Sequence, residues 1–233
     1  MRELGLLPIG ELVHRAVPAR RPARRQLTAL RFEFQPLDPD RDVDDLFAVG
    51  HQDPGADLLW TYMAYGPFAN RDAMHEWLRS CAATDDSLFF SVVERETGRR
   101  VGMCSFLSIV PEMQRIEIGH IWYAPHLQGS GISIEVAWML LMEAFEHLGY
   151  RRVEWKCNAL NERSRRAALK LGFTFEGVFR QHMIVKGRNR DTAWFSMLDS
   201  EWPARKARFE QWLDAKNFDE NGVQKLSLSA ING

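Results

Sequence analysis

The stretch from Glu117 to Ser133 constrains the fold of this chain more than any other part of its sequence. It begins as an alternating strand, passes through the loop Gln128-Gly129-Ser130-Gly131, and then opens a helix. Apolar residues keep a helical spacing from Ile134 to Leu148, and Gly149 ends that pattern. Such a loop gathers free backbone N–H groups at a helix N-terminus, which suits a phosphate or pyrophosphate group. Most loops of this kind are only tight turns, so the loop alone leaves both interpretations open.

The other segments predict an α+β fold with one mixed, mostly antiparallel sheet flanked by helices. Closely spaced alternating segments before the loop predict an antiparallel meander, and strand–helix alternation followed by a hairpin comes after it. The predicted strands cover residues 30–34, 87–94, 101–107, 114–123, 152–157, 178–185 and 192–198. The predicted helices cover residues 42–49, 71–81, 134–148, 161–171 and 201–213, with Asn161 as an N-cap and Gly172 as a stop. We expect an N-terminal extension at 1–29, one domain at 30–199, and a C-terminal helix and tail at 200–233.

Composition excludes several broad classes of protein. The 30 basic residues are balanced by 31 acidic ones, so neither nucleic acid nor an anionic membrane is an expected partner. No apolar run reaches the roughly 20 residues that span a bilayer. The three cysteines form no CxxC pair and the seven histidines no HExxH motif. We therefore expect no bound metal and a cytoplasmic location.

Several features downstream of the loop follow in a fixed order. They are Asn158, Asn161, Ser164, the sequence Leu171-Gly172-Phe173 and the pair Glu176-Gly177. Together with the loop, they make the chain resemble the GNAT N-acetyltransferases, within them the branch of the RimJ/RimL ribosomal-protein acetyltransferases. The resemblance covers residues 30–199 and is strongest at 117–177. It implies a GNAT-like acyl-CoA N-acyltransferase fold, acetyl-CoA as co-substrate and a homodimer.

The resemblance also implies roles for individual residues. The family consensus Gln/Arg-x-x-Gly-x-Gly/Ala binds the CoA pyrophosphate, and the chain departs from it at His126. The backbone of the loop would hold the pyrophosphate through Gln128, Gly129, Ser130, Gly131, Ile132 and Ser133. The pantetheine arm would pair with the main chain of Ile121, Trp122 and Tyr123, and would meet Asn158 and Asn161. Ser164 would lie near the thioester sulfur. Many members carry a tyrosine as general acid where this chain has Ala168, so Ser164 is the best remaining donor to the leaving thiolate.

Amine attack on a thioester needs a base that accepts the ammonium proton. Glu117 and His120 lie on the strand that leads into the loop, where family bases are often found. They are three positions apart, so a regular strand would point them to opposite faces, whereas a bulge near Gly119 would bring them together. We favour Glu117 acting through water, with His120 next. The alternatives are a surface carboxylate, a half-buried structural histidine and, for Ser164, an ordinary helix residue.

The substrate is an amine, carried by a small molecule or a peptide. The aromatic residues Trp60, Tyr62, Tyr65 and Phe68 either line the acceptor pocket or belong to the core. The ribosomal-protein enzymes carry a carboxylate that falls on Met183 here, which argues against a ribosomal substrate. In the plainest interpretation, the last predicted hairpin uses Arg188, Arg190 and Asp191 for its turn or for a dimer contact.

No cysteine has an evident histidine partner, which favours direct transfer in a ternary complex over a covalent intermediate. The alternative is a protein that binds or senses acyl-CoA without turnover.

Overall fold

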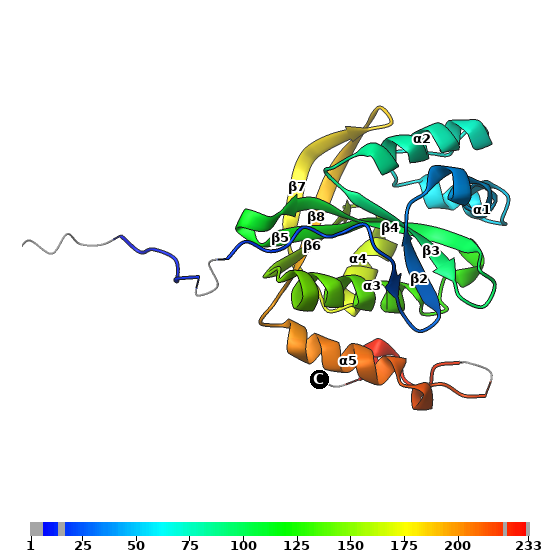
Figure 1. Ribbon diagram of the computed structural model, residues 1–233. Helices are drawn as coiled ribbons and strands as arrows, with labels where there is room; N and C mark the ends of the chain where they lie inside the picture. Colours follow the sequence, from blue (N-terminus) through cyan, green and yellow to red (C-terminus); the bar gives the residue numbers. More distant parts are fainter. Residues whose placement is uncertain (1–6, 14–16, 221–222, 232–233) are drawn as a thin grey trace, which may run out of the picture.

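The computed structural model describes residues 7–13, 17–220 and 223–231. Its strands form one eight-stranded sheet in the order β1-β2-β3-β4-β5-β6-β8-β7, and every neighbouring pair is antiparallel except β5 and β6 (Figure 1). This confirms the predicted mixed, mostly antiparallel sheet. The strands are β1 (Leu27–Thr28), β2 (Phe32–Pro36), β3 (Leu88–Glu94), β4 (Arg100–Val110), β5 (Arg115–Tyr123), β6 (Arg152–Asn158), β7 (Thr174–Val185) and β8 (Arg188–Leu198).

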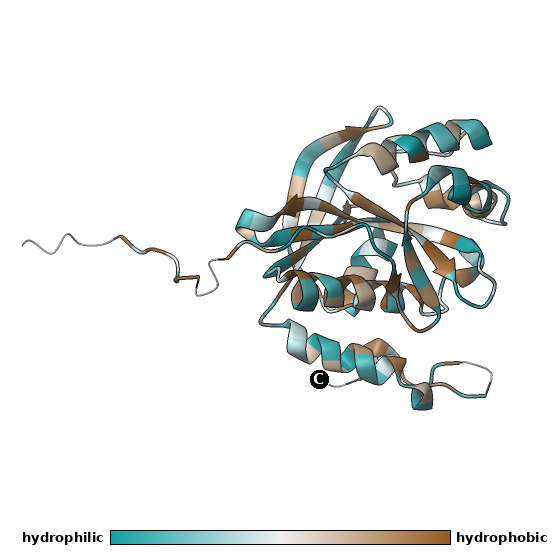
Figure 2. Cartoon of the chain, viewed as in Figure 1, coloured by the Kyte–Doolittle hydropathy of each residue, from teal (hydrophilic) through white to brown (hydrophobic). Residues whose placement is uncertain are grey.

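Helices cover both faces of this sheet. Helices α1 (Pro39–His51) and α2 (Arg71–Ala83) lie on one side, and α3 (Ile132–Met142) and α4 (Glu162–Lys170) on the other (Figure 1). Helix α5 (Trp202–Leu213) packs outside α3, which explains why α3 is apolar on nearly all sides (Figure 2). In the described residues no helix is both long and apolar enough to cross a membrane.

Local chemistry explains where several elements begin and end. The Asn161 side chain accepts the Ser164 N–H and caps α4, as predicted, and Gly172 follows that helix with a φ of +94°. Helix α3 continues as a π-helical segment, Glu143–Leu148, which the apolar spacing did not predict. Strand β7 begins four residues earlier than expected, because a register shift at Gly177 absorbs what looked like a loop.

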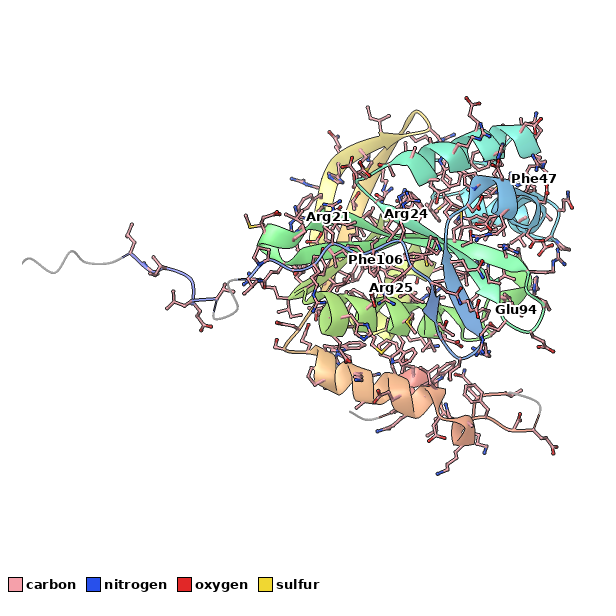
Figure 3. All side chains as sticks on the ribbon, in the orientation of Figure 1. Arg21, Arg24, Arg25, Phe47, Glu94 and Phe106 are labelled. Atoms are coloured by element: carbon pink, nitrogen blue, oxygen red, sulfur yellow. The ribbon has the colours of Figure 1, made fainter. Side chains whose placement is uncertain are left out.

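From Ala19 onward the N-terminal segment packs against the domain, whereas residues 7–13 are exposed and extend away from it (Figure 1). The N–H of Ala19 donates to the Pro111 carbonyl, and that of Arg20 to the Leu148 carbonyl. Arg21, Arg24 and Arg25 follow along this segment (Figure 3), and Arg25 forms an ion pair of 2.6 Å with the buried Glu143. Residues 1–6 and 14–16 of the predicted extension lie outside the described residues, as do 221–222 and 232–233 of the predicted tail.

Candidate active site

The sheet opens between its two parallel strands. Strands β5 and β6 pair only where Arg115–Glu117 faces Arg152–Glu154. Beyond that point β5 stays paired with β4 as far as Tyr123, and β6 stays paired with β8 as far as Asn158. The facing edges of Ile118–Tyr123 and Trp155–Asn158 therefore separate, and both line a cavity of about 890 Å³. An extended ligand can pair with a free strand edge of this kind, as an added strand does.

A β-bulge brings Glu117 and His120 to the same cavity. From Met103 to Ser105, β4 advances by two residues while its partner β5 moves by three, from Trp122 to Gly119. His120 lies in this bulge with a φ of +51°. Both Glu117 and His120 line the cavity. The bulge expected near Gly119 is thus present, and with it Glu117 and His120 both reach one cavity.

Glu117 is a buried, paired carboxylate. Its side chain accepts a hydrogen bond from Ser108 Oγ at 2.9 Å and forms an ion pair of 2.8 Å with Lys156 Nζ. Lys156 also meets Glu154 at 2.9 Å and lies 4.0 Å from the ring centroid of Trp194. Glu117 is 7% exposed, so the alternative of a surface strand residue does not describe it. A carboxylate in the wall of a cavity can act as a general base when a substrate proton comes within hydrogen-bond reach, directly or through one water molecule.

His120 is half-buried among aromatic rings. Its Nδ1 lies 3.3 Å from Tyr65 Oη, and the two rings stack with centroids 5.6 Å apart. Burial and, as a smaller cause, the charge of Arg190 together lower the pKa of His120 from its usual 6.5 to about 4. The imidazole is therefore neutral near pH 7, with a lone pair on one ring nitrogen.

The glycine loop supplies fewer donors than the sequence suggested. The N–H groups of Gln128 and Ser130 bond to the Pro125 and Leu127 carbonyls, and that of Ile132 to Ser130 Oγ. The N–H groups of Gly129, Gly131 and Ser133 have no acceptor among the described residues. Both glycines have a φ of +89°, a conformation that glycine adopts without strain.

Only part of this loop lines the cavity. Gln128, Gly129, Ile132 and Ser133 do so. Ser130 and Gly131 do not: the Ser130 carbonyl accepts from Arg31 at 3.2 Å, and Gly131 packs so closely on the Trp212 ring that a Cβ there would collide with it. Ser130 and Gly131 therefore face away from the cavity, toward Arg31 and Trp212. A helix N-terminus with free N–H groups still fits an anionic group at this end of the cavity.

Strand β6 and helix α4 form the opposite wall, where three predicted residues meet. Asn158, Asn161 and Ser164 all line the cavity. The side-chain oxygens of both asparagines are already used, because Asn158 accepts the Leu160 N–H and Asn161 the Ser164 N–H. Their side-chain NH₂ groups remain as donors to a ligand. Ser164 Oγ accepts from Trp155 Nε1 at 3.0 Å, which fixes the hydroxyl beside Cys157 on this wall.

The four predicted pocket aromatics divide into two pairs. Tyr62 and Tyr65 line the cavity, and Tyr62 Oη donates to the Leu160 carbonyl at 3.2 Å. Trp60 and Phe68 do not line it. Trp60 is 1% exposed, because the 3₁₀ turn Ala56–Trp60 directs its ring into the core, where its Nε1 donates to the Gly50 carbonyl at 2.7 Å. Phe68 packs behind Tyr65, with ring centroids 6.5 Å apart.

Lys156 and Arg190 line the cavity, and the sequence did not identify either as part of the site. Lys156 pairs with Glu117, and Arg190 lines the cavity rather than serving only a turn or a dimer contact. The available signal for Lys156 was a charged residue between Trp155 and Cys157 on a largely buried strand. Within the described residues, no group of three or more His, Cys, Asp or Glu side chains is placed to hold a metal ion.

Comparisons with known proteins agree with this geometry. Residues 31–174 match the acetyltransferase (GNAT) domain family. A GCN5-related N-acetyltransferase from Brucella melitensis has a crystal structure similar to this chain, with a TM-score of 0.89 and 40% identity, over 93% of this chain and 97% of that one. A probable acetyltransferase of the GNAT family from Chromobacterium violaceum gives a TM-score of 0.79 and 37% identity, over 85% and 98%.

A curated relative from Bacillus subtilis (strain 168), YdaF, is described by its name as a candidate ribosomal N-acetyltransferase. It is 33% identical over 109 residues, which are 47% of this chain and 59% of that protein. The chain thus matches less than two thirds of this relative's length. The family match itself covers more than half of the chain and includes both strands of the open sheet. The chain belongs to the GNAT acetyltransferase family.

Proposed function

We propose that the protein transfers an acetyl group from acetyl-CoA to a primary amine by direct attack within a ternary complex. The observation that carries this proposal is the opening between β5 and β6. It offers a free strand edge, an anion-binding helix N-terminus at one end and a buried carboxylate at Glu117, all facing one cavity. Family membership supports acetyl transfer in general, and the cavity supports this particular arrangement of the reactants.

The chain's own residues would each serve one step. Free N–H groups at Gly129 and Ser133 would bind the diphosphate, and the edge of Ile121–Tyr123 would pair with the pantetheine amides. Glu117 would accept the ammonium proton through a water molecule, and the neutral His120 is the second candidate for that role. The amine nitrogen then bonds to the acetyl carbon while the carbon–sulfur bond breaks, and the proton that this nitrogen loses passes to the leaving thiolate through solvent. Ser164 would donate a hydrogen bond to the leaving sulfur.

Direct attack is favoured over a covalent enzyme intermediate by the state of Cys157. This cysteine lines the cavity, but burial raises the pKa of its thiol. The thiolate is the nucleophilic form of cysteine, so a raised pKa disfavours acyl transfer through Cys157. Rate enhancement would come mainly from holding the two substrates together in a site that excludes water.

The proposal predicts that Glu117→Gln lowers kcat by about 10²- to 10³-fold while acetyl-CoA still binds. Thiol release from acetyl-CoA with a panel of amines measures kcat, and titration calorimetry measures binding. Glu154→Gln is the matched control, because Glu154 also pairs with Lys156 but does not line the cavity. Its kcat should stay within a few-fold of wild type.

Two results would contradict this account. Equal losses of kcat in both variants would mean that the Lys156 ion pairs matter rather than the Glu117 carboxylate at the cavity. Tight acetyl-CoA binding without thiol release in the presence of any amine would favour the alternative of a non-catalytic acyl-CoA sensor.

A further inference from the structure

Arg190 places an uncompensated positive charge in the wall of the cavity. It lies near the start of β8, opposite Met183 of β7, and its side chain is half-buried. Its Nε is buried without a hydrogen-bond partner among the described residues, and Glu117, a carboxylate that lines the same cavity, pairs with Lys156 instead. Burying a donor without a partner is unfavourable, because the donor has lost its hydrogen bonds to water. A ligand that supplies the missing acceptor regains this free energy.

The other charges near Arg190 are already used. Lys156 is paired with Glu117 and Glu154. Asp191, the next residue along the chain, accepts from the Gln181 N–H at 2.7 Å and from Asn189 Nδ2 at 2.9 Å. Arg163 also lines the cavity, but it is exposed on α4, where water can solvate it. Arg190 therefore differs from its neighbours in being both sheltered and unpaired.

The position of Arg190 associates it with the acceptor rather than with the diphosphate. Its charge acts on His120 and Cys157, which both line the cavity. The glycine loop begins beyond Tyr123, three positions further along β5 than His120, or about 10 Å at strand spacing. The hairpin that carries Arg190 also contacts the segment that leads into Tyr62 and Tyr65 of the cavity wall. Lys186 Nζ on this hairpin donates to the Trp60 carbonyl at 2.8 Å.

We propose that Arg190 binds an anionic group on the amine acceptor, so that the preferred substrates are amines that also carry a carboxylate or a phosphate. This inference rests on the proposed acetyl transfer and names its substrate class. A guanidinium binds either anion through two parallel N–H donors, which would fix the orientation of the acceptor as well as its affinity. Glu117, through a water molecule, and Arg190 would then act on the two ends of the same substrate, its ammonium group and its anion.

The test compares matched pairs of acceptors that differ in one anionic group. Phenylalanine is compared with phenylalaninamide, and phosphoethanolamine with ethanolamine, with phenylethylamine and spermidine as amines that lack an anion. The quantity is the ratio of kcat/KM for the anionic member to that for the neutral member of a pair. Comparing this ratio between wild type and Arg190→Gln cancels the intrinsic reactivity of each amine.

We expect Arg190→Gln to lower the ratio by at least about tenfold for one or both pairs, while kcat/KM for the neutral members changes little. Arg190→Lys, which keeps the charge but loses the planar fork, should fall between the two. Arg188→Gln is the control, because Arg188 lies on the same strand, is exposed and does not line the cavity. It should keep the wild-type ratio. The pair that responds tells whether the anion is a carboxylate or a phosphate.

Other outcomes distinguish a failure of the Arg190 inference from a failure of the proposed acetyl transfer. An unchanged ratio in Arg190→Gln, or acetylation of phenylethylamine and spermidine alone, would overturn the inference and leave acetyl transfer intact. Thiol release with none of these amines would overturn the proposed function. Melting temperatures of the variants, measured in parallel, show that each one is folded.

Discussion

At the scale of single residues, burial decides which groups of the cavity carry charge. His120 lies against the rings of Tyr65 and Phe89 and faces the charge of Arg190, so protonation is disfavoured and its pKa falls to about 4. In the unfolded chain the same histidine has a pKa near 6.5. Between these two values the unfolded state binds a proton that the native state does not, so the free energy of unfolding falls as the pH falls.

This difference predicts an acid-sensitive contribution from His120. Acidification from pH 6.5 to 4 should cost about 1.4 kcal/mol per pH unit, or about 3 kcal/mol in total, and nothing above pH 6.5. His120→Asn removes the titration and keeps a residue that tolerates a positive φ. Urea denaturation at pH 7 and pH 4 should show a smaller loss of stability in the variant by that amount. The same pH dependence in both proteins would contradict the burial argument.

At the scale of elements, helix α5 supports the glycine loop from behind. The Trp212 ring packs against Gly131, the residue that caps α3, and Trp212 Nε1 donates to Gln224 Oε1 at 2.7 Å. Helix α5 lies outside the segment 31–174 that matches the family, so this support comes from the part of the chain beyond it. A loop held from behind keeps its N–H groups aimed into the cavity before the ligand arrives.

We expect Trp212→Phe to weaken acetyl-CoA binding by roughly threefold to tenfold, although Trp212 does not line the cavity. Trp202→Phe is the matched control. Trp202 lies on the same helix, is similarly buried and donates to Glu146 at 2.8 Å, away from the loop. Calorimetric titration gives the Kd of both variants, and thermal melting gives their stability. Equal Kd values in the two variants would show that α5 contributes stability alone.

The elements were predictable where the signal was local. Asn161 and Gly172 mark the ends of α4 through capping chemistry, and structure and sequence agree there. The start of β7 was missed because Glu176-Gly177 has the composition of a loop, whereas Gly177 sits in a bulge. Trp60 and Tyr65 belong to one aromatic cluster in the sequence, and only the backbone of the intervening turn decides which ring faces the cavity.

At the scale of the whole molecule, the site depends on contacts between distant segments. The opening between β5 and β6 exists because β4 and β8 hold these strands apart, and no local pattern encodes where their pairing ends. The expectation of a free strand edge at Ile121–Tyr123 came from the family resemblance, whereas the residue pattern itself indicated the glycine loop and Glu117. Arg190 reaches the cavity from the last hairpin, more than 70 positions beyond Glu117 in the sequence, so a motif centred on residues 117–177 does not include it.

The most direct test of the account is thermal melting of the full chain with acetyl-CoA, CoA and ADP. A ligand present at 100 times its Kd stabilises the native state by about 2.7 kcal/mol. For a chain of this size that corresponds to a rise in Tm of about 5–10 °C. We expect such a rise with acetyl-CoA and CoA and a much smaller one with ADP, because ADP lacks the pantetheine arm that, in our proposal, would pair with β5. No rise at millimolar acetyl-CoA, or an equal rise with ADP, would contradict the assignment of this cavity to acetyl-CoA.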